Sequence, residues 1–247
     1  MKILHLRSSG GFYGAERVIL GLVQQLNGLG CENHVVCIKN SKNPHVELID
    51  KAAEAGIMAG SVECKGVFDR RTVKDIKAYI LDHGIQILHC HDYKATVFGL
   101  LASRGLRLKR IATNHLWDKI NFKLWVYERM EGVLYNFFDR VVCVSDPIAK
   151  TVRPFVLNKK KVQVIPNGID VKNFSVERKA QSVEEKPDFM IGIVGRLVPQ
   201  KGHRVFINVM KKLHDEFPNL KCIFVGEGFE RENLESLIQN AGLTQTI

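Results

Sequence analysis

A short apolar strand runs directly into a basic, glycine-containing loop in the stretch IGIVGRLVPQKG, residues 191–202. The loop carries a guanidinium at Arg196 and an ammonium at Lys201, and a helix-like pattern begins just after it. Glycine lets the backbone approach a ligand closely, and a helix N-terminus offers free N–H groups with partial positive charge. Arginine can fork two phosphate oxygens, while lysine supplies a point charge. The stretch therefore predicts a strand–loop–helix unit suited to a diphosphate.

The same alternation of strand-like and helix-like segments fills the chain before this stretch. Short runs rich in Val, Ile and Leu favour a parallel sheet that is covered by helices on both faces. Residues 1–168 are therefore predicted to form a Rossmann-like α/β domain. We expect strands at 2–7, 34–38, 85–90, 110–113, 140–144 and 162–165, and helices at 14–29, 45–55, 71–83, 94–103, 116–138 and 147–156, with one more short strand between the second and third helices.

The composition changes after Asp170. Residues 169–188 are predicted to be a linker, because most of this segment is charged and polar and Pro187 lies near its end. A second series then follows, with strands expected at 190–194 and 221–225 and helices at 205–215 and 227–241. Two strands and two helices are too few to close a doubly wound domain of ordinary size. Residues 189–247 are therefore expected to form only part of a second Rossmann-like domain.

Another glycine loop lies between the first expected strand and the first expected helix. Its G-G-x-x-G spacing, at Gly10, Gly11 and Gly14, differs from the G-x-G-x-x-G fingerprint of dinucleotide-binding folds. The second strand ends at Ile38-Lys39, so a basic residue stands where those folds place an acidic residue that holds a ribose. These two departures disfavour a nicotinamide-dependent dehydrogenase. A Walker A loop is excluded as well, because glycine rather than serine or threonine follows Lys201.

The stretch VIPNGID, residues 164–170, lies shortly before the basic loop. With these two signatures in this order, the chain closely resembles the glycosyltransferase family 4 group of GT-B enzymes over nearly its whole length. The resemblance implies an α/β fold of GT-B type, with a complete N-terminal Rossmann-like domain on the acceptor side and a partial second one that binds the nucleotide-sugar. It also implies a retaining, metal-independent hexosyltransferase-like enzyme.

The implied reaction moves a sugar from a nucleotide-diphosphate-sugar donor to a hydroxyl of a polysaccharide, lipopolysaccharide or glycolipid type of acceptor. No cofactor is expected besides this donor substrate. In the resemblance, Arg196 and Lys201 neutralise the diphosphate leaving group, and Glu227 in the turn Val-Gly-Glu-Gly lines the donor pocket. An ordinary turn glutamate is the competing interpretation of Glu227.

Two more features of the first domain acquire roles from the resemblance. Gly10, Gly11 and Gly14, the last of which begins the run Gly-Ala-Glu-Arg, would let the first domain close on the donor. His115, in a Thr-x-His pattern at the end of an expected strand, would be the catalytic-site residue that acts on the donor sugar or the acceptor. A tight strand–helix turn without a ligand, and a structural histidine, are the competing interpretations.

His89 and His91, in the run Leu-His-Cys-His-Asp, invite a metal-site interpretation with Cys90 and Asp92. Alternate residues of a strand share a face, so Cys90 points away from the two histidines, and no partner cluster is evident in the sequence. We therefore expect no metal, and we expect His91 and Asp92 to hydrogen-bond within the cleft wall.

The positive charge is concentrated in the first domain. The net charge is +10, and residues 1–168 hold 25 Lys and Arg against 15 Asp and Glu, whereas residues 169–247 hold 11 of each. Such asymmetry indicates an acidic partner or a basic face kept for solubility. The aromatic, basic stretch 117–138 resembles the surface through which family members contact anionic membranes, with core packing as the alternative. No nucleic-acid-binding pattern is found, so nucleic acid is not an expected partner.

Six scattered cysteines, the lack of a signal-peptide pattern and the lack of a stretch of about 20 apolar residues favour a cytoplasmic protein, peripheral to the inner face of the cell membrane. The resemblance implies a Glu-x7-Glu signature whose carboxylates contact the donor, and this signature would lie beyond Ile247. Glu227 and Glu235 have the same spacing, but we expect them on a helix that does not face the donor. A truncated chain is therefore expected, and a non-catalytic remnant or a subunit completed by a partner chain stays an open alternative.

Overall fold

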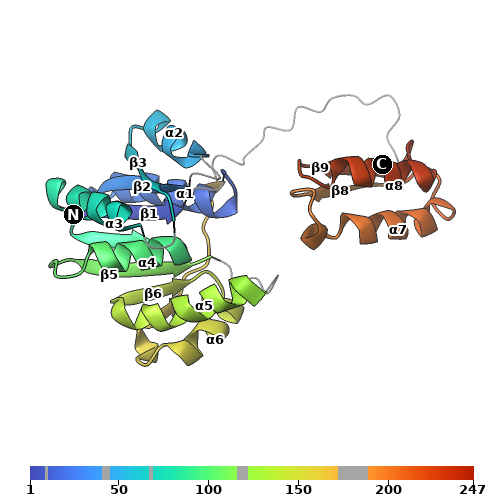
Figure 1. The fold of residues 1–247 in the computed structure, drawn as a ribbon. Helices are drawn as coiled ribbons and strands as arrows, with labels where there is room; N and C mark the ends of the chain where they lie inside the picture. The colour runs from blue at the N-terminus through green and yellow to red at the C-terminus, as the bar shows by residue number, and fades with distance from the viewer. Residues whose placement is uncertain (9–10, 41–44, 67–68, 116–121, 172–188) are drawn as a thin grey trace. The chain divides into compact units, whose positions relative to one another are not determined.

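The computed structural model describes residues 1–8, 11–40, 45–66, 69–115, 122–171 and 189–247. It divides into two compact units, Met1–Val176 (unit 1) and Glu177–Ile247 (unit 2), each with a sheet and a core of its own (Figure 1). Within each sheet the strands are parallel, and helices connect strands that follow one another in the chain. The expected α/β class is therefore confirmed. Most of the predicted linker, residues 172–188, lies outside the described residues.

Unit 1 is built on a seven-stranded sheet in the order β3-β2-β1-β4-β5-β6-β7, in which all neighbouring strands are parallel. The strands are β1 (Lys2–Ser8), β2 (Glu32–Asn40), β3 (Met58–Cys64), β4 (Ile87–Cys90), β5 (Lys109–Asn114), β6 (Arg140–Cys143) and β7 (Val162–Val164). The chain runs outward from β1 to β3 and returns to β4 on the other side of β1. Ligands of open parallel sheets bind beyond the carboxyl ends of the strands at such a reversal of strand order.

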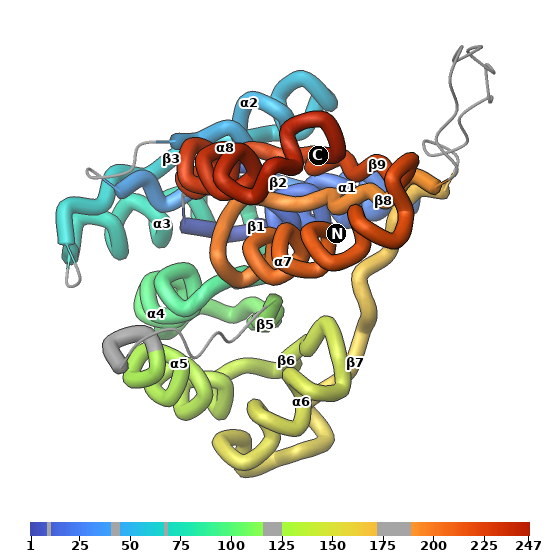
Figure 2. The backbone as a smooth tube through the Cα atoms, turned by 90° about the vertical axis from the view of Figure 1, so that its right-hand side faces the viewer, coloured from blue at the N-terminus to red at the C-terminus, as the bar shows by residue number. Residues whose placement is uncertain are grey.

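The helices of unit 1 cover the two faces of this sheet. They are α1 (Gly14–Gly28), α2 (Glu47–Glu54), α3 (Arg70–Asp82), α4 (Tyr93–Ala102), α5 (Phe122–Leu134) and α6 (Asp146–Val152). Helix α3 packs against α4, and α4 packs against α5 (Figure 2). Asp69 and Asp92 cap α3 and α4 by accepting from the backbone N–H groups of Arg71 and Ala95. Such caps satisfy N–H groups that the helix itself leaves free.

Alternation along the central strands separates the two cores of unit 1. Leu4 and Leu6 of β1 belong to the larger core, which also contains buried residues of α3 and α4. His5 lies between them in sequence, so its side chain points to the other face of the sheet. There Val35, its neighbour on β2, packs in a smaller core with α1 and α2. A polar residue is thus buried on the α1 side of the most central strands.

Unit 2 consists of β8 (Met190–Val194), α7 (His203–His214), β9 (Lys221–Val225) and α8 (Arg231–Asn240). The two strands are parallel, and both helices pack through one core against the face that bears Ile191 and Phe224. The side chains of the opposite face, among them Val194 and Ile223, are exposed. Parallel sheets are ordinarily covered on both faces, so this face has an unusual apolar exposure for its sheet type.

Several predicted segments differ from the structure. The helix expected at 147–156 is α6, which ends at Val152, followed by a 3₁₀ turn at Arg153–Phe155. The helix expected at 116–138 is α5 followed by a 3₁₀ turn at Tyr135–Phe137, while residues 116–121 lie outside the described residues. The helix expected from Glu227 begins at Arg231, because the backbone before it bonds to the loop after β8. The strand expected at 34–38 extends over the whole of β2. All six cysteines are free thiols, and no described helix is long and apolar enough to span a bilayer.

Candidate functional site

A partly buried ion-pair network ties together the carboxyl edge of the unit 1 sheet. Arg7 of β1 donates from Nε to Oε1 of Glu16 at 2.9 Å and from a terminal nitrogen to the backbone carbonyl of His91 at 2.7 Å. The guanidinium also lies 3.6 Å from the carboxylate of Asp92. Burial favours a lower pKa for Arg7, but the charges of Asp92 and Glu16 outweigh burial and raise its pKa. Arg7 therefore stays charged and joins β1, α1 and the end of β4.

Asp92 connects this network to two backbone segments. Its Oδ2 accepts from the backbone N–H of Ser8 at 2.7 Å and from the Ser8 hydroxyl at 2.9 Å. Its Oδ1 accepts from the N–H of Ala95 at 2.8 Å and so caps α4. The hydrogen bonding expected of Asp92 is present, and it fixes where the chain leaves β1.

Two of the three glycines of the first loop, Gly11 and Gly14, are described, and they lie in the chain between β1 and Glu16 of this network. Gly10 falls outside the described residues. Gly11 has a φ of +104°, and a Cβ there would lie 2.8 Å from the ring of Tyr13, so the position favours glycine. Gly14 begins α1, and a Cβ there would meet no other atom within 4 Å. The backbone at Gly14 is thus open to an approaching group, and the roles expected for the three glycines stay predictions.

His115 directly follows β5 at the same edge of the sheet. Its Nε2 lies 3.2 Å from Nδ1 of His91, whereas its Nδ1 is buried and has no hydrogen-bond partner among the described residues. Burial, aided by the charge of Arg7, lowers the pKa of His115 to about 4. The ring is therefore neutral near pH 7, with one N–H and one lone pair. A neutral imidazole of this kind can orient a hydroxyl group.

Three further imidazoles cluster next to His115. His5, His89 and His91 are buried, and one ring nitrogen of each lies within 4.8 Å of the others. Burial lowers the pKa of His5 to about 4 and lowers the pKa of His89 and His91 well below the usual value. Neutral imidazoles are the form that binds metal ions.

The partner that the sequence did not reveal for His89 and His91 is His5, which lies opposite His89 in the register of β1 and β4. The three rings could therefore hold a metal ion. However, Nδ1 of His5 and Nε2 of His91 already lie at hydrogen-bonding distance, 3.1 Å. His89 likewise contacts the hydroxyl of Thr113 through Nε2 at 2.7 Å. The expectation that no metal binds stays a prediction.

In unit 2, the loop after β8 and the loop after β9 are joined at the carboxyl edge of the sheet. The backbone N–H of Leu197 donates to the carbonyl of Glu227 at 3.0 Å, and the N–H of Glu230 donates to the carbonyl of Leu197 at 3.2 Å. A Cβ at Gly228 would lie 2.2 Å from the Leu197 carbonyl oxygen. Only glycine permits this approach, so the two loops form one joined rim.

Arg196 and Lys201 both belong to this rim. The stem of Lys201 lies over the start of its loop, because a Cβ at Gly195 would be 3.6 Å from Lys201 Cδ. Gly202, with a φ of +75°, leads into α7, whose first turn has no side-chain cap. Uncapped N–H groups at a helix N-terminus, next to a guanidinium and an ammonium, suit an anionic group. Arg196, Lys201 and the start of α7 belong to one strand–loop–helix unit, as the sequence predicted, and the phosphate-binding role of the two cations stays a prediction.

Glu227 lies on the same rim, but its carboxylate is already paired. It accepts from Arg231 in the first turn of α8, and Arg231 Nε donates to Glu235 at 2.9 Å. Glu227 precedes α8 rather than lying on it, which corrects the expectation that Glu227 and Glu235 share a helix. Both carboxylates are exposed and held by one guanidinium. The binding role expected for Glu227 stays a prediction.

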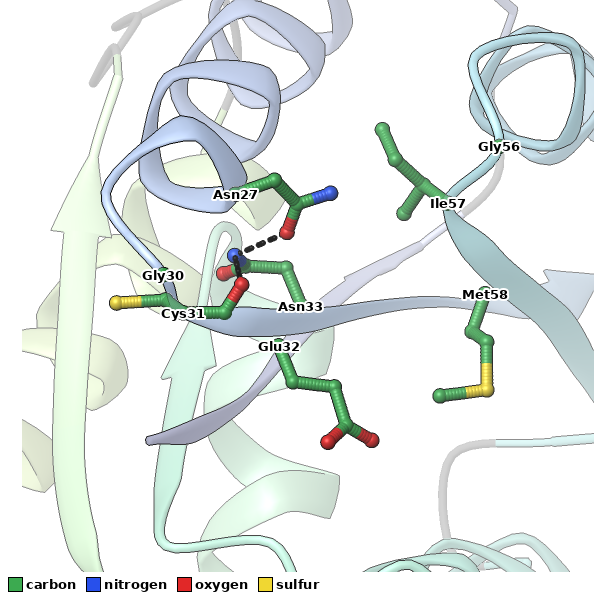
Figure 3. A pocket seen from close by; sticks show the side chains of 8 residues that line it. All are labelled: Asn27, Gly30, Cys31, Glu32, Asn33, Gly56, Ile57 and Met58. Carbon is green, nitrogen blue, oxygen red and sulfur yellow. Dashed lines mark hydrogen bonds between the residues drawn. The ribbon is translucent and has the colours of Figure 1, made fainter.

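A pocket of about 380 Å³ lies at the opposite edge of the unit 1 sheet (Figure 3). It is formed at the amino ends of β2 and β3, where Asn33 and Met58 lie, and it is therefore remote from Arg7 and His115. In the figure the amide of Asn33 points to Asn27. The site predicted from the sequence does not include this pocket.

Three residues near the carboxyl edges of the two sheets were not predicted from the sequence as site residues. The sequence pattern gave no role to Arg7 or Glu16, because their pairing depends on how α1 folds back on β1. His203, the first residue of α7, is buried against the ring of Phe224, and neither of its ring nitrogens has a partner among the described residues. A histidine directly after the Lys-Gly of the basic loop was the available signal for it.

Two Rossmann-like α/β units, each with a glycine-containing loop at the carboxyl edge of its sheet, define the architecture class. A family model for Glycosyltransferase Family 4 matches residues 12–173, and one for Glycosyl transferases group 1 matches residues 175–247. The chain therefore belongs to glycosyltransferase family 4. This finding confirms the resemblance inferred from the basic loop and the VIPNGID stretch.

Two relatives are about one quarter identical to this chain in sequence. A phosphatidyl-myo-inositol mannosyltransferase of Mycolicibacterium smegmatis is 26% identical over 237 residues, which are 93% of this chain and 59% of that protein. The phosphatidylinositol N-acetylglucosaminyltransferase GPI3 subunit of Saccharomyces cerevisiae is 25% identical over 180 residues, 70% of this chain and 40% of that protein. The chain thus spans about half the length of these relatives.

Solved structures agree with the fold. Anabaena Alr3699/HepE in complex with UDP has a TM-score of 0.82 and 20% identity, and the similarity covers 100% of this chain and 68% of that one. The same protein in complex with UDP-glucose has a TM-score of 0.80 at 20% identity, covering 100% of this chain and 67% of that one. A sucrose-phosphate synthase of Thermosynechococcus elongatus has a TM-score of 0.74 at 17% identity, covering 99% and 69%. The GT-B type of fold is thereby confirmed.

Proposed function

We propose that the protein transfers a sugar, with retention of configuration, from a nucleoside-diphosphate sugar to a hydroxyl acceptor. The observation that carries the proposal is the rim of unit 2, which combines Arg196, Lys201 and the uncapped start of α7. Membership of glycosyltransferase family 4 supports it. So does the structural neighbour Anabaena Alr3699/HepE, which was solved in complex with UDP and with UDP-glucose.

The chemistry follows from where charge develops. When the bond between the sugar and the diphosphate breaks, negative charge grows on the leaving phosphate oxygens. Arg196 can contact two of these oxygens, and Lys201 adds a point charge. The N–H groups at the start of α7 can donate to a third phosphate oxygen. These groups stabilise the transition state electrostatically without a resident metal ion.

Unit 1 would supply the groups that meet the sugar and its acceptor. His115 is neutral, and its buried Nδ1 has no hydrogen-bond partner among the described residues, so this atom can contact a substrate hydroxyl. The open backbone at Gly14 lets a ligand approach the start of α1. Arg7, held by Glu16 and Asp92, keeps this edge in one conformation.

A matched pair of variants tests donor binding. Lys201→Ala removes a cation from the rim, whereas Lys211→Ala removes an exposed lysine from the last turn of α7, at the other end of that helix. Calorimetric titration with uridine, guanosine and adenosine diphosphates should give one preferred base in the unmodified protein. Lys201→Ala should weaken that binding about tenfold or more, and Lys211→Ala should leave it unchanged. Equal affinities for all three proteins would contradict the proposed site.

A lipid-linked acceptor at an anionic membrane is the acceptor class that we propose. Both relatives described above are named for phosphatidylinositol substrates. The outer face of α5 and the turn after it expose Trp125, Arg129, Met130, Val133 and Phe137, an apolar surface with a basic residue in it. Such a face can lie in the headgroup region of a bilayer.

Co-sedimentation with vesicles tests this acceptor class. Val133→Asp should reduce binding to vesicles that contain anionic phospholipid. Leu81→Asp is the matched control, because Leu81 is a similarly exposed apolar residue on α3: the exposed fractions are 59% for Leu81 and 55% for Val133. Vesicle binding that does not depend on anionic lipid, or an equal loss of vesicle binding in both variants, would exclude this face of α5 as a membrane-binding surface.

A subunit completed by another chain is the second candidate. The exposed apolar face of the unit 2 sheet favours it, since a partner could cover that face. The relative named GPI3 subunit supports the same idea. Activity that appears only when a co-purified second chain is present would favour this candidate over an enzyme that acts alone.

A further inference from the structure

A chain of hydrogen bonds links four polar side chains across the α1 side of the unit 1 sheet. Asn33 Oδ1 lies 3.1 Å from Nε2 of His5, and Nδ1 of His5 lies 3.1 Å from Nε2 of His91. Nδ1 of His91 in turn lies 3.2 Å from Nε2 of His115. The chain runs from the amino end of β2, through β1 and the residue after β4, to the residue after β5. It ends at the edge where the candidate site lies.

The orientation of Asn33 gives this chain a direction. Asn33 Nδ2 donates to Asn27 Oδ1 at 2.7 Å and lies 3.4 Å from the backbone carbonyl oxygen of Cys31 (Figure 3). A backbone carbonyl can only accept, so turning the amide over would place two oxygens against each other. Asn33 therefore presents its Oδ1, an acceptor, to His5.

Neutral imidazoles transmit this direction from ring to ring. His5 faces an acceptor through Nε2, so Nε2 carries its proton and Nδ1 is left with a lone pair. His91 must then donate to His5 from Nε2, which leaves its own Nδ1 as an acceptor. His115 must donate to that acceptor from Nε2. Burial lowers the pKa of all three rings, so the neutral form assumed in each step is the one present near pH 7.

The end of the chain coincides with an independent observation. If His115 carries its proton on Nε2, its Nδ1 must hold a lone pair. That atom is one of the few buried side-chain nitrogens for which the described residues offer no hydrogen-bond partner. The direction set at Asn33 thus predicts an acceptor at the position where an unused acceptor is found.

We propose that Asn33, His5 and His91 are positioning residues that hold His115 as the Nε2–H tautomer, with its Nδ1 lone pair reserved for a hydroxyl of the bound substrate. The part that concerns substrate rests on the proposed function, whereas the tautomer does not. We call the hydrogen-bonded series Asn33, His5, His91 and His115 the relay. His89 does not belong to it, because its Nε2 is hydrogen-bonded to the hydroxyl of Thr113. The relay explains why polar side chains are buried in the middle of a parallel sheet.

The tautomer can be measured directly on the unmodified protein. Two-bond nitrogen–proton correlation spectra of protein labelled with ¹⁵N-histidine distinguish a protonated ring nitrogen from one with a lone pair, and His115→Gln assigns the signal. Near neutral pH the relay requires Nε2–H and an unprotonated Nδ1 in His115, His91 and His5 alike. A proton on Nδ1 of His115 overturns the proposal, whatever the activity of the protein.

Two substitutions at His5 test the transmission. His5→Gln keeps both contacts, because the Gln amide can donate to Asn33 and its oxygen can accept from His91. His5→Leu cuts the relay two residues away from His115. The Nε2–H tautomer of His115 should persist in His5→Gln and should mix with the Nδ1–H form in His5→Leu. A single Nε2–H tautomer in His5→Leu would mean that the relay does not set it.

Turnover separates this proposal from the proposed function. If both hold, His5→Leu should lower kcat by about tenfold, the effect of losing one neutral hydrogen bond, with the donor KM nearly unchanged. His5→Gln should restore the rate. A confirmed tautomer in a protein without transferase activity would refute the function and leave the relay standing. Sugar transfer by a protein whose His115 carries its proton on Nδ1 would support the proposed function and refute the relay.

Discussion

Unit 1 should lose stability as the pH falls from about 7.5 to about 5, because it buries neutral histidines. His5 is 1% exposed, and burial lowers its pKa from 6.5 to about 4. The unfolded chain therefore binds a proton at a higher pH than the folded chain does. Stability from this source is fully present above about pH 6.5 and is lost as the pH drops toward 4. His91 and His115, with pKa values lowered by burial, act in the same direction.

The size of the loss follows from the two pKa values of His5. At about pH 5 the unfolded side chain is almost fully protonated and the folded one almost fully neutral. The difference amounts to about 2 kcal/mol for His5 alone, at about 1.4 kcal/mol per pKa unit. Stopping near pH 5 keeps the surface carboxylates largely ionised, so their own titration contributes little.

Urea unfolding followed by tryptophan fluorescence is the assay. The chain has two tryptophans, at positions 117 and 125, and both belong to unit 1, so the signal reports unit 1 alone. His5→Gln should shrink the pH-dependent loss by about 2 kcal/mol. His45→Gln, at an exposed histidine, is the control and should change nothing. A loss in His5→Gln equal to that of the unmodified protein would refute the reasoning.

Two further predictions concern glycines that lie close to other atoms. Gly99→Ala should destabilise unit 1 by about 1–3 kcal/mol in the same urea assay, because its Cβ would lie 2.6 Å from a buried sulfur of β4. Gly21→Ala, in an uncrowded position of α1, should instead be neutral or stabilising. Gly228→Ala should abolish nucleotide binding by pushing the Leu197 carbonyl away, as judged by calorimetry, while Gly192→Ala, with free space around it, should bind normally. Normal binding in Gly228→Ala would show that the joined rim is not needed.

The elements of the fold were largely predictable because they depend on local patterns. The expected strands 190–194 and 221–225 coincide with β8 and β9, where short apolar runs stand between polar segments. The start of α8 was wrong by four residues. Its sequence is helical in character from Glu227, but the backbone there is held by hydrogen bonds to the loop after β8. Such contacts between distant segments leave no periodic signal.

The candidate site was predictable only in part for the same reason. Arg196 and Lys201 lie in one loop, so their proximity is already present in the sequence. His5 and His89 meet because β1 and β4 are neighbours in register, although 84 residues separate them. Arg7 and Asp92 likewise meet across that strand pair. Spacing along the chain pointed to His89, His91 and Asp92 but gave no role to His5 or Arg7, because their pairings depend on strand order.

Sugar transfer by the unmodified protein, compared with Arg196→Ala, tests the central claim most directly. The protein would be incubated with the nucleoside-diphosphate sugar that it binds best and with phospholipid vesicles containing phosphatidylinositol, and the glycolipid product would be analysed for its anomeric configuration. The account predicts a product with the configuration of the donor and a loss of transfer in Arg196→Ala, with the fold intact by circular dichroism. Equal transfer by Arg196→Ala, or a product of inverted configuration, would contradict it.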